Sequence, residues 1–314
     1  GIQSEKINRM TAAHQIWKTL PLAPDITQLL PAELTQRLLM EFEGKAQWLL
    51  APNQFSWPDT SFIRPYIEDW RKQLTDAPGA LRLQTAESYT DQELRLLYAM
   101  ISRALGYINN RYTYFFDVMD RGLDYTKEAI PVSKTKAETG YHTDSTAKTY
   151  YPDFVGLLCL QPAIQGGESL LANAANLYSF LQTNFPQWNE WMHTPLCRDV
   201  ITPGTIQNID AIRANDIPLF QSDEQGGVFF RYMRYWIESA FEKLNNPAPA
   251  ELTDLLNTID SFFANAENAM CFRLERGDML FVNNRFLCHN RTAFSDGANP
   301  RVYVRAWIND SKQD

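Results

Sequence analysis

The spacing of hydrophobic residues divides the chain into an N-terminal part with helical periodicity and a longer part with short, strand-like runs. Within roughly the first 130 residues, apolar side chains recur every three or four positions after Pro31, and again after a capping box of Thr90 and Glu93. From about residue 138 the pattern changes to short apolar runs between turn residues, which is typical of strands. The predicted strands are 154–160, 169–172, 228–235, 269–274, 279–282 and 301–308.

Many short strands separated by polar turns are typical of a β-sandwich or a jelly roll. Two predicted helices, 174–181 and 249–263, interrupt the strands. We therefore expect a mainly β fold with flanking helices (α+β), organised as one domain over residues 1–314. Residues 1–130 would form a mostly helical buttress, and residues 131–314 the β core with its helical insertions.

The composition of the chain indicates which kinds of molecule the protein could bind. With 29 Lys and Arg against 37 Asp and Glu, the formal net charge is −8, which argues against nucleic acid, because phosphate binding needs a basic surface. No apolar run approaches the ~18 residues of a membrane span, and the N-terminus lacks a signal-peptide pattern. Four scattered cysteines predict reduced, mostly buried thiols and a cytoplasmic location. A small-molecule partner fits this balance best, and nothing indicates an oligomeric state.

The pair His142 and Asp144, together with the distant His289, is a candidate metal site. On a strand, residues i and i+2 project from the same face, so His142 and Asp144 could reach one cation. Each part alone has an ordinary explanation: a surface turn for the pair, and a hydrogen-bonded core histidine for His289. Two imidazoles and one carboxylate are nevertheless the ligand set of non-haem iron oxygenases, which leaves three metal positions open.

A second candidate feature is a pair of arginines in the last predicted strand. Alternation places Arg301, Tyr303 and Arg305 on one face, with Val302 and Val304 on the other. A guanidinium can clamp a carboxylate through two parallel hydrogen bonds. The alternative is a pair of surface arginines on an edge strand.

Together these motifs resemble the Fe(II)- and 2-oxoglutarate-dependent oxygenases of the taurine dioxygenase and clavaminate synthase type. The likeness covers roughly residues 138–172 and 277–308. It consists, in chain order, of His142-Thr-Asp144, a strand, Gly166-Gly167-Glu168-Ser169, Asn284-Arg285, His289, Arg301 and Arg305. The subgroup stays open. An aspartate at the position of Asp144 is typical of taurine dioxygenases, whereas the sequence from His289 to Phe294 is more similar to clavaminate synthase.

The resemblance implies a double-stranded β-helix (jelly-roll) core and a single catalytic domain. It also implies Fe(II) bound by His142, Asp144 and His289, with 2-oxoglutarate as co-substrate and O2 as oxidant. The expected reaction is hydroxylation of an unactivated C–H bond in a small molecule, such as an amino acid or a specialised metabolite, with release of succinate and CO2. Related halogenases have Gly or Ala where this chain has Asp144, so halogenation is not expected.

For the co-substrate, the resemblance implies that Arg301 binds the distal carboxylate of 2-oxoglutarate with the help of the Ser169 hydroxyl. Arg305 could contact either the co-substrate or an acidic group of the substrate. Desaturation, epoxidation, cyclisation and a peptide substrate remain open alternatives. A redox-silent metal-binding jelly-roll protein is an alternative from a different class, although it would have no need of the serine and arginine set.

Two further segments are candidates for the substrate region. The stretch 229–236 mixes arginines with aromatic residues and could line a pocket, but an ordinary strand leading into a helix explains it equally well. The loop 145–153 directly follows the metal motif and could act as a lid.

Overall fold

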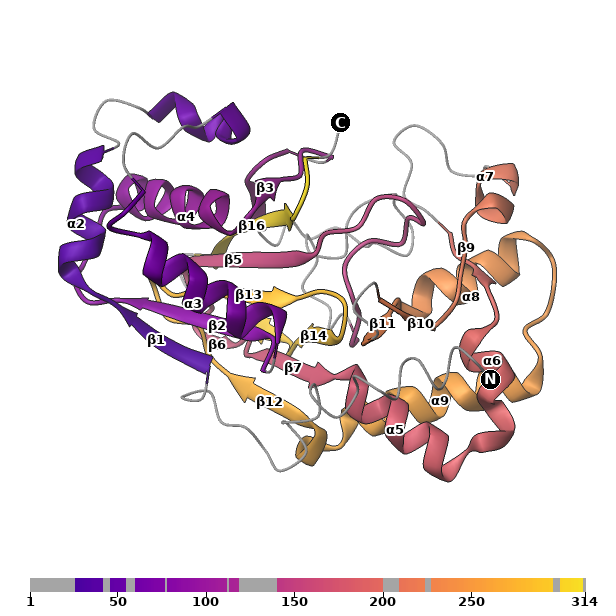
Figure 1. Ribbon diagram of the computed structural model, residues 1–314. Helices are drawn as coiled ribbons and strands as arrows, with labels where there is room; N and C mark the ends of the chain where they lie inside the picture. Colours follow the sequence, from indigo (N-terminus) through magenta and orange to yellow (C-terminus); the bar gives the residue numbers. More distant parts are fainter. Residues whose placement is uncertain are drawn as a thin grey trace.

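The computed structural model describes residues 26–41, 46–54, 60–76, 78–111, 113–118, 140–199, 209–223, 227–295 and 300–312. Two sheets form its centre, and their strands run side by side in Figure 1. The larger sheet, here called the major sheet, has seven strands in the order β1-β2-β13-β5-β16-β3, with β4 pairing β16. The smaller one, the minor sheet, has the order β12-β7-β14.

The major sheet joins strands from both ends of the chain. All its pairings are antiparallel except that of β1 with β2, which is parallel. Its strands are β1 (Thr27–Leu30), β2 (Ala80–Thr85), β3 (Tyr107–Ile108), β4 (Phe116–Val118), β5 (Phe154–Gln161), β13 (Met279–Asn283) and β16 (Val302–Asn309).

The minor sheet is antiparallel and has β7 at its centre. Its strands are β7 (Ser169–Asn173), β12 (Ala269–Phe272) and β14 (Leu287–Arg291). Three short two-stranded pairs complete the β structure: β6 (Gln165–Gly166) with β15 (Phe294–Ser295), β8 (Leu196–Cys197) with β9 (Asp216–Ile217), and β10 (Phe220–Ser222) with β11 (Val228–Phe230).

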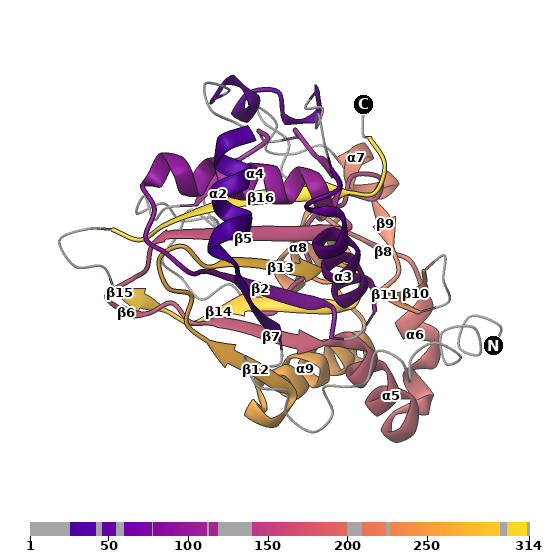
Figure 2. The same cartoon turned by 60° about the vertical axis from the view of Figure 1, so that its left-hand side comes forward.

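Helices of the N-terminal third cover the outer face of the major sheet (Figure 2). They are α2 (Ala32–Glu41), α3 (Arg64–Thr75) and α4 (Asp91–Leu105), with the 3-10 turns η3 (Ala46–Leu49) and η4 (Pro52–Gln54). The predicted capping box is present, because Thr90 accepts from the Glu93 amide and Glu93 accepts from the Thr90 amide.

The remaining helices lie around the minor sheet and the short strand pairs, with α5 and α9 on the β7–β12 side in Figures 1 and 2. They are α5 (Ala174–Asn184), α6 (Asn189–His193), α7 (Ile209–Ala214), α8 (Arg234–Lys243) and α9 (Ala250–Ala264), with the 3-10 turns η6 (Pro186–Trp188) and η7 (Ala266–Asn268). No helix among the described residues is long and apolar enough to cross a membrane.

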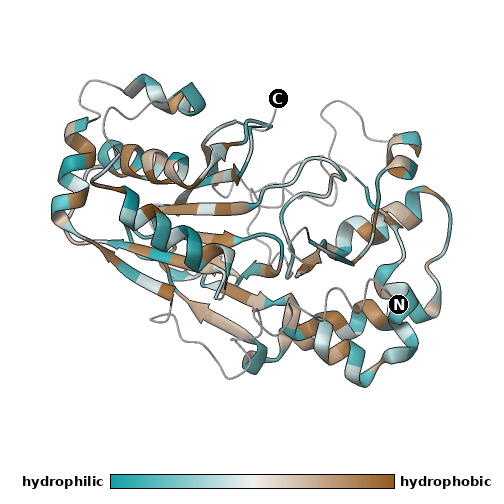
Figure 3. Ribbon diagram, in the orientation of Figure 1, coloured by the Kyte–Doolittle hydropathy of each residue, from teal (hydrophilic) through white to brown (hydrophobic). Residues whose placement is uncertain are grey.

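Strand alternation separates two hydrophobic clusters, one on each face of the major sheet. On β13, Met279 and Phe281 pack with the N-terminal helices, whereas Leu280 and Val282 pack with the minor sheet and α9. Figure 3 shows hydrophobic residues concentrated on these central strands and on the helix faces toward them. The cavity described below opens between the two sheets, on the second of these faces.

The structure corrects several of the expectations drawn from the sequence. The N-terminal third is not only helical, because β2 lies in the major sheet between β1 and β13. The strand predicted over 228–235 ends at Phe230, and helix α8 begins at Arg234. All four cysteines are free, but the expectation of mostly buried thiols is wrong for Cys271, which is exposed.

Candidate active site

The backbone brings the two histidines of the motif together. His142 and His289 form an isolated antiparallel bridge in which each amide donates to the other residue's carbonyl, at 3.0 and 2.9 Å. Their ring centroids are consequently 4.4 Å apart. His289 lies on β14, a strand that the hydrophobic pattern did not predict. Three of its residues, His289, Asn290 and Arg291, are polar, so the segment lacks the apolar run by which strands were recognised.

Asp144 reaches the histidines from a bend rather than from a regular strand, so the expected strand alternation is not what places it. The buried Asn284 fixes it instead: its side chain accepts from the Asp144 amide at 2.8 Å and donates to the Asp144 carbonyl at 3.1 Å. Thr143 points elsewhere, since its hydroxyl accepts from the Tyr232 amide. Ser145 then adopts a φ of 73°, in the left-handed region.

The donor atoms have the spacing that one divalent ion needs. The Asp144 Oδ1 atom lies 2.8 Å from Nε2 of His289 and 3.6 Å from Nε2 of His142, and all three donor atoms lie within 4.8 Å of one another. Neighbouring ligands of an octahedral divalent ion with bonds of about 2.1 Å, such as Mg²⁺, lie about 3 Å apart. Nδ1 of His142 donates to the Gly140 carbonyl at 2.9 Å, which leaves Nε2 for a metal. The residues present therefore fit the ion.

The second oxygen of Asp144 is held from β16. The Trp307 indole donates to Oδ2 at 2.7 Å, and Nη1 of Arg305 lies 3.6 Å from the same atom. Burial disfavours the charged form of Asp144, but His289, Arg305 and the imidazole hydrogen bonds together hold its pKa well below the usual range. Burial also lowers the pKa of His289, which favours the neutral imidazole that binds metal.

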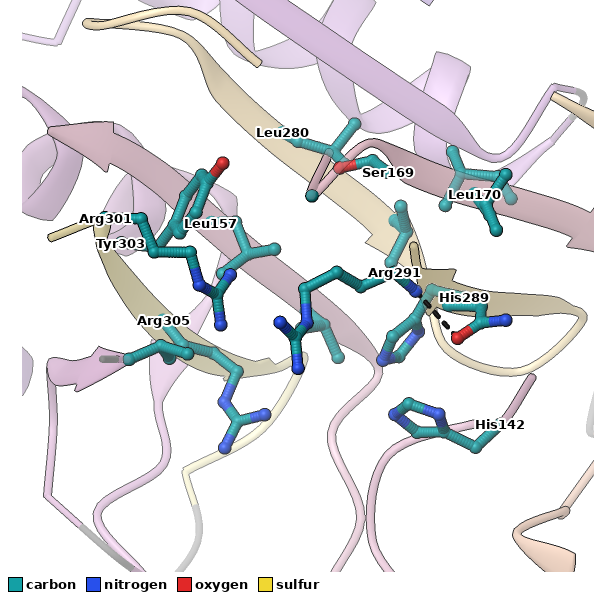
Figure 4. Close-up of a pocket in the computed structure, with 16 residues that line it drawn as sticks. His142, Leu157, Ser169, Leu170, Leu280, His289, Arg291, Arg301, Tyr303 and Arg305 are labelled. Carbon is teal, nitrogen blue, oxygen red and sulfur yellow. Dashed lines mark hydrogen bonds between the residues drawn. The ribbon is translucent and has the colours of Figure 1, made fainter. Parts of the chain in front are cut away.

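A cavity that is open to solvent lies beside the histidines. Its apolar wall comes from both sheets, and three guanidinium groups converge on its polar side, as Figure 4 shows. The residues lining it are Val118, His142, Val155, Leu157, Gly167, Ser169, Leu170, Leu171, Leu280, Val282, His289, Asn290, Arg291, Arg301, Tyr303 and Arg305.

The predicted alternation along the last strand is confirmed. Arg301, Tyr303 and Arg305 line the cavity, whereas Val302 and Val304 pack with the N-terminal helices. The alternative of two surface arginines on an edge strand is wrong, because β16 lies between β5 and β3 and Arg301 is buried.

Aromatic rings support the three guanidinium groups. The central carbons of Arg291 and Arg301 lie 4.4 and 4.2 Å from the centroid of the same ring, that of Phe294. Arg305 lies 5.5 Å from the centroid of Phe116. A guanidinium at such distances gains from the quadrupole of the ring.

The structure unites all six residues singled out from the sequence. His142, Ser169, His289, Arg301 and Arg305 line the cavity, and Asp144 contacts both histidines.

Sequence reasoning missed three residues of this site: Arg291, Phe294 and Trp307. A signal for Trp307 was available, since it continues the i, i+2 series of Arg301, Tyr303 and Arg305.

The stretch 229–236 does not supply any of the described residues that line the cavity. Its buried Arg231 instead holds the loop 145–153, donating to the Ala147 carbonyl at 2.6 Å and stacking on Tyr151 at 4.8 Å. Asn215 holds the same loop through the Thr146 carbonyl and the Lys148 amide. These contacts tie the loop to the elements around it in this structure, and its role as a lid stays a prediction.

Comparison with known proteins identifies the family. The model of the family described as "Taurine catabolism dioxygenase TauD, TfdA family" matches residues 41–307. The chain therefore belongs to this family, and the resemblance inferred from its motifs is confirmed. Its class is that of the iron(II)- and 2-oxoglutarate-dependent oxygenases.

Solved structures agree in fold. An asparagine oxygenase in complex with Fe(II), 2S,3S-3-hydroxyasparagine and succinate has a TM-score of 0.69 at 15% identity, covering 91% of this chain and 94% of that one. The non-haem iron oxygenase OrfP in complex with Fe and alpha-ketoglutaric acid has a TM-score of 0.61 at 14% identity, with the same coverage. At this identity the likeness shows the fold alone, which confirms the expected jelly-roll class.

Among curated proteins, "FR-33289 synthase" of Streptomyces rubellomurinus (strain ATCC 31215) is 28% identical over 193 residues. The match covers 59% of this chain and 55% of that protein, so the chain spans about half the length of the curated relative it matches.

Proposed function

We propose that the protein hydroxylates an unactivated C–H bond of a small molecule, using Fe(II), 2-oxoglutarate and O2 and releasing succinate and CO2. The observation that carries this proposal is the juxtaposition of two features in one cavity. Two imidazoles and one carboxylate converge within 4.8 Å, and carboxylate-binding guanidinium groups line the same space. A redox-silent metal protein would need only the first feature.

In this proposal His142, Asp144 and His289 would hold the iron. The ion, with 2-oxoglutarate and O2, supplies the oxidising power for the C–H bond. The contribution of the protein is the fixed geometry of the three donors and a cavity wall that is largely apolar, which limits the access of water to the reacting centre. With the carboxylate of Asp144 present, we expect oxygen insertion and not halide transfer.

Arg301 and Ser169 are the proposed site of the distal carboxylate of 2-oxoglutarate. Arg301 is buried beside the cavity, and its guanidinium stacks on Phe294. Arg305 differs, because it lies 3.6 Å from the outer oxygen of Asp144 and hence near the metal end. We assign Arg305 to an acidic group of the substrate, where it would hold that group close to the reacting C–H bond.

The proposed substrate is an amino acid or a related acidic metabolite. Small-molecule sites are mostly apolar with a few polar groups that fix the ligand, and the wall of this cavity has that composition. The neighbouring structures support this choice, because the asparagine oxygenase is in complex with 2S,3S-3-hydroxyasparagine and OrfP is in complex with (3S)-hydroxy-L-Arg.

An anaerobic titration tests the cofactor part of this proposal. Fe(II) and 2-oxoglutarate added together should give the weak visible charge-transfer band of the chelate, and His142→Ala should abolish it. No band at saturating concentrations would contradict the assignment. A panel of amino acids and acidic metabolites, scored by stimulated succinate release and product mass, then identifies the substrate. If no acidic compound in the panel stimulated release while a neutral or peptide one did, the role of Arg305 would be wrong.

A further inference from the structure

The cavity contains one more arginine than the sequence motif assigned. Arg291 lies on β14, two positions after His289, and its side chain points into the cavity from the same face (Figure 4). In Figure 4 its guanidinium lies between that of Arg301 and the imidazole of His289. A cationic group in this place acts on any ligand that reaches from the metal toward Arg301.

Strand pairing puts Arg291 beside the serine of the proposed co-substrate site. In the antiparallel pair of β14 with β7, Arg291 is the direct partner of Ser169, just as His289 is the partner of Leu171. Side chains of direct partners project on the same face with their Cβ atoms ~5 Å apart. The hydroxyl of Ser169 and the side chain of Arg291 therefore start from neighbouring points of the cavity wall.

The ring of Phe294 contacts both Arg291 and Arg301. Both guanidinium carbons lie within 4.4 Å of the centroid of this one ring, which is almost completely buried. Two guanidinium groups near one ring repel each other, and a carboxylate in contact with both would offset that repulsion. A carboxylate has two oxygens that together accept about four hydrogen bonds, so it has the capacity for two guanidiniums and a hydroxyl.

We propose that Arg291, Arg301 and Ser169 form a single carboxylate site with two guanidinium groups, and that its ligand is the distal carboxylate of 2-oxoglutarate. This inference rests on the proposed function, because it assumes that 2-oxoglutarate is the co-substrate. It extends that function by making Arg291 a co-substrate-binding residue. The residue thereby contributes to the choice of a dicarboxylate over 2-oxo acids that end in a methyl group.

The test compares two 2-oxo acids that differ at the distal end. 2-Oxoglutarate and 2-oxobutyrate are titrated anaerobically into protein loaded with Fe(II) and, for calorimetry, with Mn(II). We expect Arg291→Met to weaken 2-oxoglutarate binding about tenfold, equivalent to the loss of one charge-assisted interaction, and to leave 2-oxobutyrate binding unchanged. Arg291→Lys, which keeps the charge, should retain part of the affinity.

The matched control is Arg82→Met, because Arg82 also stacks on a phenylalanine, Phe272, at 5.3 Å, but does not line the cavity. It should bind both acids like the wild type. Unchanged 2-oxoglutarate affinity in Arg291→Met would overturn the inference. If the KM for the substrate rose at the same time, Arg291 would be a substrate-binding residue instead. Equal losses for both acids would also overturn it. A wild type that binds no 2-oxoglutarate would instead contradict the proposed function.

Discussion

The two ends of the cavity are built by different means. At the metal end, short side chains are positioned by backbone pairing, since His142 and His289 exchange amide hydrogen bonds and Asn284 holds both backbone groups of Asp144. At the other end, here called the anion end, the long side chains of Arg291 on β14 and Arg301, just before β16, rest on the ring of Phe294.

This difference matches what each end has to do. A metal needs donor atoms placed to within tenths of an ångström, and a short side chain on a fixed backbone has few torsions through which to depart from that position. A carboxylate needs positive charge and hydrogen-bond donors, which a guanidinium supplies over a wider range of geometry. We therefore expect substitutions at the metal end to affect metal binding, and substitutions at the anion end to affect the 2-oxoglutarate requirement alone.

The largest effect is expected for Asp144→Ala. Removal of the only carboxylate among the three donors should lower metal affinity and reduce turnover on the order of 10³-fold or more, as for members of a catalytic unit that act together. Metal binding followed by calorimetry and substrate-coupled succinate formation are the measurements. Asp254→Ala, which removes an exposed acid of α9, is the control. Succinate formation that persisted at the wild-type rate would show that Asp144 is not a ligand.

Arg301→Met is expected to have the next largest effect, and only on the co-substrate. The loss of two charge-assisted hydrogen bonds at about 1.5 kcal/mol each should raise the 2-oxoglutarate concentration for half-maximal rate roughly 100-fold. Metal affinity should stay that of the wild type, because the guanidinium of Arg291 lies between Arg301 and His289 in Figure 4. If the 2-oxoglutarate requirement did not change, the clamp would be at Arg305 or elsewhere.

The donor residues were predictable from the sequence because each belongs to a motif with a fixed order. His142, Asp144, His289, Arg301 and Arg305 all fall in one cavity or in contact with it. The reasoning for Asp144 was nevertheless wrong in its geometry, since a bend fixed by Asn284 replaces the expected strand. Motif order singled out residues that meet at one cavity, whereas the placement of Asp144 depends on a long-range hydrogen bond that the local pattern does not contain.

The parts that could not be predicted depend on strand pairing across long sequence separations. Arg291 and Phe294 become neighbours of Arg301 only after β14 pairs with β7 and β15 with β6. The N-terminal strand β2 was hidden for a similar reason, because it pairs with β13 almost 200 residues later. At Arg234, a helix begins where an aromatic run had suggested that the strand continues.

Trp307→Phe tests how far the metal end depends on contacts outside the three donors. The indole N–H holds Oδ2 of Asp144 at 2.7 Å, which directs Oδ1 toward the histidines. Loss of this hydrogen bond should lower metal affinity about tenfold. This is the small end of the range for hydrogen-bond partners of metal ligands, because Arg305 still faces Oδ2. Mn(II) or Co(II) calorimetry measures this, with Trp236→Phe, a buried tryptophan outside the cavity lining, as control. If Trp307→Phe and Trp236→Phe bound metal equally well, Trp307 would contribute only to packing and not to metal binding.

Phe294→Leu should have the smallest effect, and on the opposite end. Leucine keeps an apolar side chain in this position but lacks the π face on which Arg291 and Arg301 rest. At roughly 0.5–1 kcal/mol for a cation–π contact, we expect 2-oxoglutarate affinity to fall about 2- to 5-fold. Metal affinity should not change, which is the reverse of the Trp307→Phe result. If Phe294→Leu also weakened metal binding, the metal end and the anion end would be coupled. Their different architecture would then not mean that metal and 2-oxoglutarate bind independently.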